Sequence, residues 1–126
     1  MSAAPVPSPA LHELVLRARD LGRFPIAYLS IIEGGIERLH VRLGLEAEHL
    51  PADSAFPFMA AEPMVGPEGR AVGRLGVADV IPRELTRAQR TGLANLAALA
   101  FARVEALRDA GSLSAPAGTT TWGGKS

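Results

Sequence analysis

Hydrophobic and polar positions first follow a helical period near the start of the chain. Apolar side chains recur three or four positions apart over residues 9–21, with charged residues between them. Ser8 is typical of a helix N-cap, and Pro9 of the first helical position, where its missing N–H costs no hydrogen bond. Gly22 follows the last apolar residue, as is common at a helix C-terminus. The pattern therefore predicts a short amphipathic helix.

From Pro25 the period changes to two residues, which is typical of β-strands. Residues 26–32 are rich in residue types that favour β-strands, and Gly34-Gly35 then supplies the turn of a hairpin. The return strand is predicted to turn two sets of side chains to opposite faces: Leu39, Val41 and Leu43 on one, and Arg38, His40 and Arg42 on the other.

A second strand pair is predicted further along the chain, after a loop over residues 44–55. Residues 56–59 form a short edge strand in this prediction, because Pro57 cannot donate a hydrogen bond in a central strand. Met64-Val65 ends another strand, residues 66–69 form a turn, and residues 70–78 form its partner.

The last predicted element is a long helix with a recognisable start. Thr86 and Gln89 have the spacing of a capping box, and Gly111 is placed to end the helix. Its apolar stripe comprises Leu93, Leu96, Ala97, Ala100, Val104 and Leu107. We thus expect a flexible arm over residues 1–7, one domain over residues 8–109, and a flexible tail over residues 110–126.

Four stretches of the sequence resemble GAF domains and occur in the order found in that family. They are residues 24–32 (FPIAYLSII), 41–44 (VRLG), 63–79 (PMVGPEGRAVGRLGVAD) and 81–89 (IPRELTRAQ). The resemblance implies an α+β fold, in which the N- and C-terminal helices pack together on one face of an antiparallel sheet. It also implies that the other face is where family members carry a small-molecule pocket. Only residues 59–62 stand where relatives place a long insertion that covers this pocket.

Composition excludes several classes of chemistry. The sequence contains no cysteine, which removes disulfides, thiolate nucleophiles and a covalently attached bilin, and also the cysteine pair of a methionine-sulfoxide reductase built on this fold. Lys plus Arg and Asp plus Glu are both 13, so net charge gives no reason to expect nucleic acid or an anionic membrane. The three histidines lack metal-ligand spacing. We therefore expect a protein without catalysis, metal or cofactor, and a cytoplasmic location by default.

The candidate functional surface is the sheet face opposite the helices. Its proposed ligand or partner residues are Tyr28, Ser30, Arg38, His40, Arg42, Phe56, Phe58 and Arg74. A solvated sheet face with ordinary alternation remains the simpler interpretation of these residues. A second surface is predicted on the helices, where Leu16, Leu99, Ala102 and Ala106 would suit a homodimer. Trp122 is a candidate anchor in the tail, since tryptophan is enriched in binding sites.

Two functions remain open from the sequence. The first is a regulatory or protein-interaction subunit of a larger assembly, favoured because the pocket-covering insertion is short. The second is a sensor domain that keeps a reduced pocket for a small molecule. The residues themselves do not identify the partner or the ligand.

Overall fold

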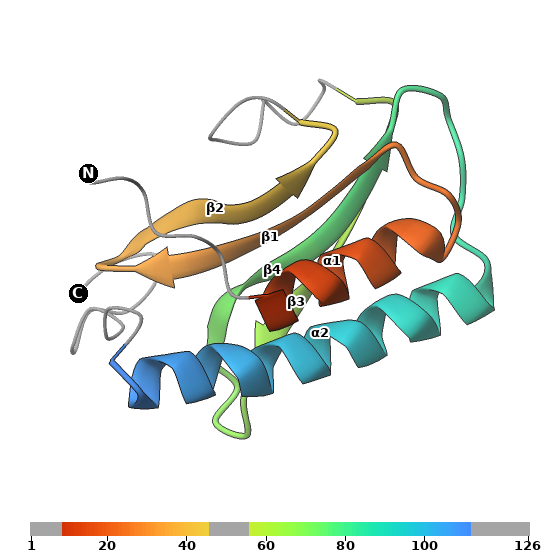
Figure 1. Cartoon of the computed structure of the whole chain (residues 1–126). Coiled ribbons are helices and arrows are strands. Elements are labelled where there is room, and N and C mark those ends of the chain that lie inside the picture. The colour runs from red at the N-terminus through yellow and green to blue at the C-terminus, as the bar shows by residue number, and fades with distance from the viewer. Residues whose placement is uncertain (1–8, 46–55, 112–126) are drawn as a thin grey trace.

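The computed structural model of the protein describes residues 9–45 and 56–111. The elements in chain order are α1 (Pro9–Asp20), β1 (Ile26–Glu33), β2 (Ile36–Leu43), β3 (Phe58–Val65), β4 (Ala71–Asp79) and α2 (Arg87–Asp109). The strands form one antiparallel sheet in the order β2-β1-β4-β3. Both helices lie side by side, in opposite directions, on one face of the sheet (Figure 1). The predicted α+β architecture is confirmed.

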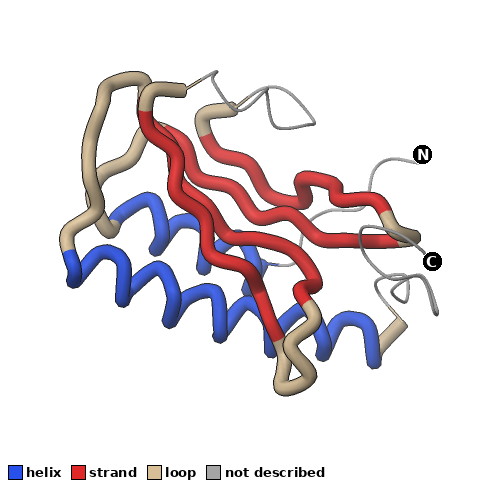
Figure 2. Tube along the Cα trace, turned by 180° about the vertical axis from the view of Figure 1, so that it is seen from behind, coloured by secondary structure: helices blue, strands red, loops and turns tan. Residues whose placement is uncertain are grey.

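We call the side of the sheet that packs on α1 and α2 the helix face, and the other side the distal face. Leu29 and Ile31 of β1 point to the helix face, where they join the hydrophobic core, and Tyr28 and Ser30 therefore point to the distal face. The tube in Figure 2, seen from behind, shows the four strands on one side and the two helices on the other.

The core is built from the apolar stripes that the sequence predicts. Both helices bury their stripes: Leu11, Leu14, Val15 and Ala18 of α1, and Leu93, Leu96, Ala97, Ala100 and Val104 of α2. Each fully buried Leu or Val contributes about 1.5–3 kcal/mol relative to an exposed position. Packing of these stripes on the sheet therefore fixes the helix face.

The capping box of α2 is confirmed. Thr86 Oγ1 accepts a hydrogen bond from Gln89 N at 3.0 Å, and Thr86 N donates to Gln89 Oε1 at 2.9 Å. Gln89 Nε2 also donates to Leu21 O at 3.3 Å, so the same residue links α2 to the end of α1. At the far end, Gly111 has a φ of +80°, the left-handed conformation that glycine adopts readily after a helix.

A charged residue pair joins the end of β4 to the turn between α1 and β1. Arg83 Nη1 donates to Asp79 Oδ2 at 2.9 Å, and Arg83 Nη2 donates to Gly22 O at 2.7 Å. The guanidinium also lies 4.2 Å from the centre of the Phe24 ring, in a cation–π contact. Arg83 thus holds together segments that are about sixty residues apart in the sequence.

The strict alternation predicted for β2 is wrong, because a β-bulge interrupts it. Leu29 lies opposite Val41, but the next residue of β1, Ser30, lies opposite Leu39, so His40 is the extra residue. Residues opposite one another share a face. Leu39 therefore lies on the distal face and Val41 on the helix face, although the sequence pattern assigns both to the same face.

The predicted break between residues 59 and 62 is also wrong. Residues 58–65 form one continuous edge strand, β3, in place of two strands separated by a remnant of an insertion. Pro63 is accommodated because β3 pairs on one side only among the described residues. The expected arm over residues 1–7, the Ser8 cap and most of the expected tail lie outside the residues that the structure describes.

Candidate functional site

The centre of the distal face carries a polar network that spans three strands. Ser30 of β1 lies directly opposite Arg74 of β4, and Glu37 of the neighbouring β2 reaches both. Arg74 Nε and Nη2 donate to the two carboxylate oxygens of Glu37, at 2.9 and 3.1 Å, as a bidentate pair. Ser30 Oγ donates to the same carboxylate and accepts from Arg74 N at 3.1 Å.

The network determines the charge state of Glu37. Partial burial alone would raise the pKa of the Glu37 carboxyl, but hydrogen bonds from Arg74 and Ser30, with the positive charge of Arg74, outweigh that effect. The pKa of Glu37 consequently lies below its ordinary value. This face therefore carries an internal ion pair, so that Arg74 does not contribute an unbalanced positive charge.

Tyr28 lies beside this network, and its buried hydroxyl has no hydrogen-bond partner within the part of the chain that the structure describes. Gly76 lies opposite Tyr28 and has no side chain, so the ring packs against its backbone; an added Cβ would come within 2.4 Å of the phenol. Burial raises the pKa of the Tyr28 hydroxyl, although nearby Arg74 acts in the opposite direction. A buried hydroxyl without a partner is unusual, since such groups nearly always form hydrogen bonds.

The bulge distributes the other predicted residues of β2 over both faces. Arg42 lies opposite Tyr28 and shares the distal face with it, whereas Arg38 lies opposite Ile31 and belongs to the helix face. His40 Nε2 lies 3.0 Å from Glu33 Oε1, on the same edge of the sheet. The prediction that Arg38, His40 and Arg42 form one surface is therefore wrong, because the register shift interrupts their alternation.

Phe58 is also absent from the distal face. Its ring stacks on Phe24 with centroids 5.6 Å apart, and both rings belong to the core between the sheet and the helices. Phe56 lies two residues before β3 and is half-buried. Of the residues predicted for this surface, the structure thus groups four on the distal face: Tyr28, Ser30, Arg42 and Arg74.

Glu37 is the member of the site that sequence pattern reasoning missed. A signal for it was present, because a two-residue turn at Gly34-Gly35 places Glu33 opposite Ile36 and Ile32 opposite Glu37. Counting outward from that turn puts Glu37 on the same face as Ser30, within reach of Arg74 on the other neighbouring strand.

Three of the four residues predicted for the helix surface are exposed, and the fourth, Leu16, is not. Leu99 is 52% exposed, and Ala102 and Ala106 are exposed on the same side of α2. Leu16 of α1 is half-buried. Trp122 lies outside the described residues.

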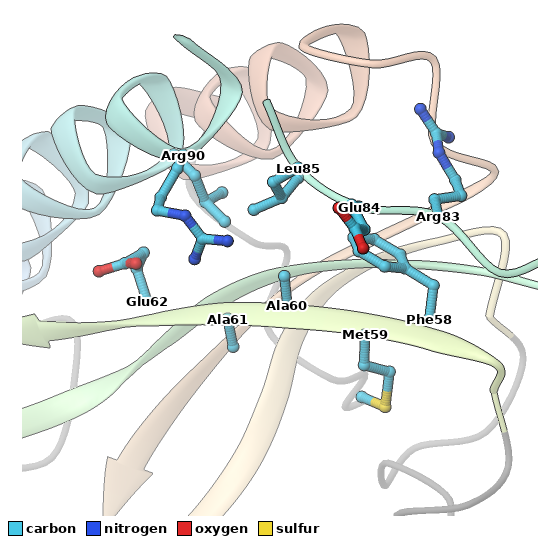
Figure 3. Close-up of a pocket in the computed structure, with 10 residues that line it drawn as sticks. Phe58, Met59, Ala60, Ala61, Glu62, Arg83, Glu84, Leu85 and Arg90 are labelled. Carbon is cyan, nitrogen blue, oxygen red and sulfur yellow. The ribbon is translucent and has the colours of Figure 1, made fainter. Parts of the chain in front are cut away.

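A cavity of about 360 Å³ lies at the opposite edge of the molecule, beside β3 and the start of α2. Ala60 and Glu62 point from β3 to the helix side, toward Leu85 and Arg90, whereas Met59 and Ala61 point to the distal side (Figure 3). The cavity walls combine apolar and charged side chains. Sequence reasoning did not identify it, because the contributing segments are far apart along the chain.

The described residues hold no cluster of three or more His, Asp or Glu side chains that would bind a metal ion. Within the same residues, neither helix is long and apolar enough to span a membrane. Within the described part of the distal face, the hydroxyl of Ser30 is bound to Glu37 and Arg74 in the network described above. The network orders this face, because the hydroxyl, the carboxylate and the guanidinium are bound to one another.

Comparison with solved structures identifies the class of fold. The chain superimposes on the GAF domain of a proposed sensor histidine kinase from Pseudomonas syringae pv. tomato with a TM-score of 0.68 and 16% identity, covering 83% of this chain and 82% of the other. A domain of a proposed two-component sensor histidine kinase protein from Sinorhizobium meliloti 1021 gives a TM-score of 0.64 and 15% identity, covering 83% and 98%. No protein-family model matches the sequence. No curated protein matches it either.

The chain therefore has the fold of GAF domains, as the four sequence stretches imply. At this level of identity the likeness concerns the fold, and the function has to be argued from the site.

Proposed function

We propose that the protein is a non-catalytic regulatory domain that acts by binding another protein through the distal face of its sheet. The observation that carries this proposal is the Ser30–Glu37–Arg74 network. In a pocket for a small polar ligand, these groups would be held ready to bind the ligand. Here they bind one another across three strands, which creates a rigid, nearly charge-balanced surface.

The composition of this face also supports a protein partner. Leu39 lies opposite Ser30 and Pro63 lies opposite Arg74, and Met59 lies further along β3 on the same face, so the ordered polar centre has apolar groups beside it. Mixed surfaces of this kind, with a few fixed hydrogen-bonding groups, are typical of non-obligate interfaces. Both structural neighbours come from proposed sensor histidine kinases, which are signalling proteins, and a regulatory role agrees with that origin.

Site-specific photo-cross-linking in the native cell tests this proposal. A photoreactive amino acid replaces Arg42, which is exposed on the distal face, or Arg17, which is exposed on α1, as the matched control. We expect a defined protein adduct from position 42 and none from position 17. Equal labelling from both positions, or no adduct from position 42, would contradict binding through the distal face.

The buried hydroxyl of Tyr28 favours a second function, that of a small-molecule sensor. This donor has no partner among residues 9–45 and 56–111, and a ligand that accepts a hydrogen bond would remove the cost of leaving it unpaired. Thermal-shift screening of small metabolites and cyclic nucleotides tests this function, with Tyr28→Phe as the control. A stabilising compound whose effect disappears in Tyr28→Phe would support a sensor. No shift across the library would count against it.

A further inference from the structure

The outer side of β3 is a free sheet edge among the described residues, since β3 pairs only with β4. The direction of its backbone groups follows from the neighbouring strand. Arg74 N donates to Ser30 Oγ and so points toward β1, which makes the Arg74–Pro63 pair one of the non-hydrogen-bonded kind. Pro63 therefore turns its backbone away from β4. By alternation, Ala61 and Met59 turn their N–H and C=O groups outward as well.

Unpaired edge groups are normally protected, and β3 has protection at one end only. Pro63 lacks an N–H, and a register shift follows between Met64 and Val65, so pairing cannot extend in that direction. Residues 58–62 have no such protection. The other edge strand, β2, is bulged in its middle and carries charged side chains along its length. Of the two edges, β3 is thus better suited to pairing.

Beside this edge, the side chains of Glu62 and Arg90 form no ion pair or hydrogen bond within residues 9–45 and 56–111. Both line the cavity, and the Arg90 guanidinium extends toward β3 above Ala60 and Glu62 (Figure 3). The methyl group of Ala60 is small, so the cavity has room beside it for a further side chain. A carboxylate entering at Ala60 would meet an unpaired guanidinium.

We propose that β3 pairs with β3 of a second copy of this chain, in antiparallel register about a two-fold axis at Ala61. In this arrangement each Ala61 exchanges N–H and C=O bonds with its counterpart. Each Met59 N–H donates to the Pro63 carbonyl of the other copy, so the missing Pro63 N–H limits the length of the pairing. The result is one continuous sheet through both copies, joined edge to edge.

This register also pairs the charges. Glu62 of the second copy lies opposite Ala60, and its carboxylate enters the cavity beside Arg90. Two-fold symmetry creates the same ion pair on the other side. A register centred on Ala60 would place Glu62 opposite Phe58, next to Glu84, where two carboxylates would repel one another. The charges therefore favour the axis at Ala61. The pairing uses few residues, so it buries less than the about 1,600 Å² of a standard interface, and we expect a weak dimer.

Exchange of the two charges tests the pairing. Light scattering on size-exclusion fractions at high micromolar concentration should show a dimer for the unmodified chain, weakened about tenfold by either Glu62→Arg or Arg90→Glu. The double variant restores the ion pair with reversed polarity and should restore the dimer. Circular dichroism confirms that each variant is folded. A monomer at every concentration, or a dimer that Leu99→Asp abolishes and charge reversal does not affect, would overturn the proposal.

Cysteine cross-linking tests the register. Because the chain has no cysteine of its own, Ala61→Cys introduces a single thiol at the proposed axis, where opposed Cα atoms lie about 5.5 Å apart, within disulfide range. Mild oxidation should link the Ala61→Cys chains and leave the Ala60→Cys chains unlinked. Linkage through Ala60→Cys, or through neither position, would overturn an axis at Ala61. Pairing through the β3 edge does not depend on the proposed function of the distal face.

Discussion

In Tyr28, packing explains the position of the ring but does not explain the presence of the hydroxyl group. Its ring is fully buried against Gly76, but its hydroxyl has no hydrogen-bond partner among the described residues. In a chain selected only for stability, a phenylalanine at this position would avoid the desolvation of the hydroxyl. The hydroxyl is therefore the group on this face that is most in need of a functional explanation.

We predict that Tyr28→Phe leaves the free energy of unfolding unchanged or raises it by up to about 1 kcal/mol, because it removes a buried and unpaired polar group. Urea denaturation of the purified proteins measures this difference. Loss of about 1 kcal/mol or more would mean that the hydroxyl forms a hydrogen bond in solution, to water or to a retained ligand.

Glu37 leads to a prediction about pH. Its pKa is lowered in the folded protein, so folding favours the ionised form. The stabilisation is complete above the pKa of an unfolded glutamate, about 4.3, and is lost as the pH falls through the lower pKa of the folded state. Glu37→Gln should therefore cost about 1 kcal/mol at pH 7, a value that allows for solvent screening of the half-exposed Arg74.

Denaturation at several pH values checks this prediction. The difference between the unmodified chain and Glu37→Gln should shrink steadily between pH 5 and pH 3. Glu68→Gln, in the exposed turn between β3 and β4, is the matched control and should change stability little at any pH. A difference for Glu37→Gln that is independent of pH would show that the ion pair does not stabilise the fold. Asp79 should also lose its contribution to stability as the pH falls. Desolvation raises the pKa of its carboxyl, but Arg83 and two backbone amides lower it by more, so the net pKa is lowered.

At the scale of elements, the helices and the paired strands are set by local sequence. The apolar stripes, the capping box at Thr86 and the turn at Gly34-Gly35 each determine their structure within a few residues, and all were predictable. The errors concern features that depend on a neighbouring strand. Alternation in β2 cannot reveal a bulge, because the bulge is a mismatch between two strands.

The face to which Phe58 points is likewise determined by a neighbouring strand. It follows from the register of β3 on β4, in which Phe58 lies opposite Asp79, and the ring then stacks on Phe24. From the sequence, Pro57 limits residues 56–59 to a short edge strand, separate from the strand that ends at Met64-Val65. An edge strand tolerates Pro63, however, because its backbone points away from β4. Pairing between strands that are distant in the sequence therefore determines which face Phe58 and the residues of β2 occupy, and local sequence pattern does not predict it.

The capping box of α2 leads to a prediction about the stability of the protein. Thr86→Ala removes the acceptor for Gln89 N and should lower the free energy of unfolding by about 1 kcal/mol. Thr91→Ala, at an exposed position in the first turns of α2, is the matched control. It should be neutral or slightly stabilising, because alanine has the higher helix propensity. Chemical denaturation of both variants compares them, and equal effects would show that the cap contributes little.

At the scale of the whole molecule, the two faces and the β3 edge of the sheet differ in what they contact. The helix face is occupied by α1 and α2, the distal face is ordered by Ser30, Glu37 and Arg74, and the β3 edge carries unpaired backbone and charge. Pairing through β3 would leave the distal face of each copy free. A dimer joined in this way would present two distal faces on one continuous sheet, so binding of a partner to both would be strengthened by avidity.

The central claim is that the distal face binds a protein and not a small molecule. Native mass spectrometry of the chain, isolated gently from its own source, tests this claim most directly. Arg42→Glu on the distal face and Arg17→Glu on α1 serve as a matched pair of charge reversals. We predict a complex with a second protein that persists in Arg17→Glu and is lost in Arg42→Glu. A chain without a protein partner that carries a stoichiometric small molecule, released by Tyr28→Phe, would contradict the claim.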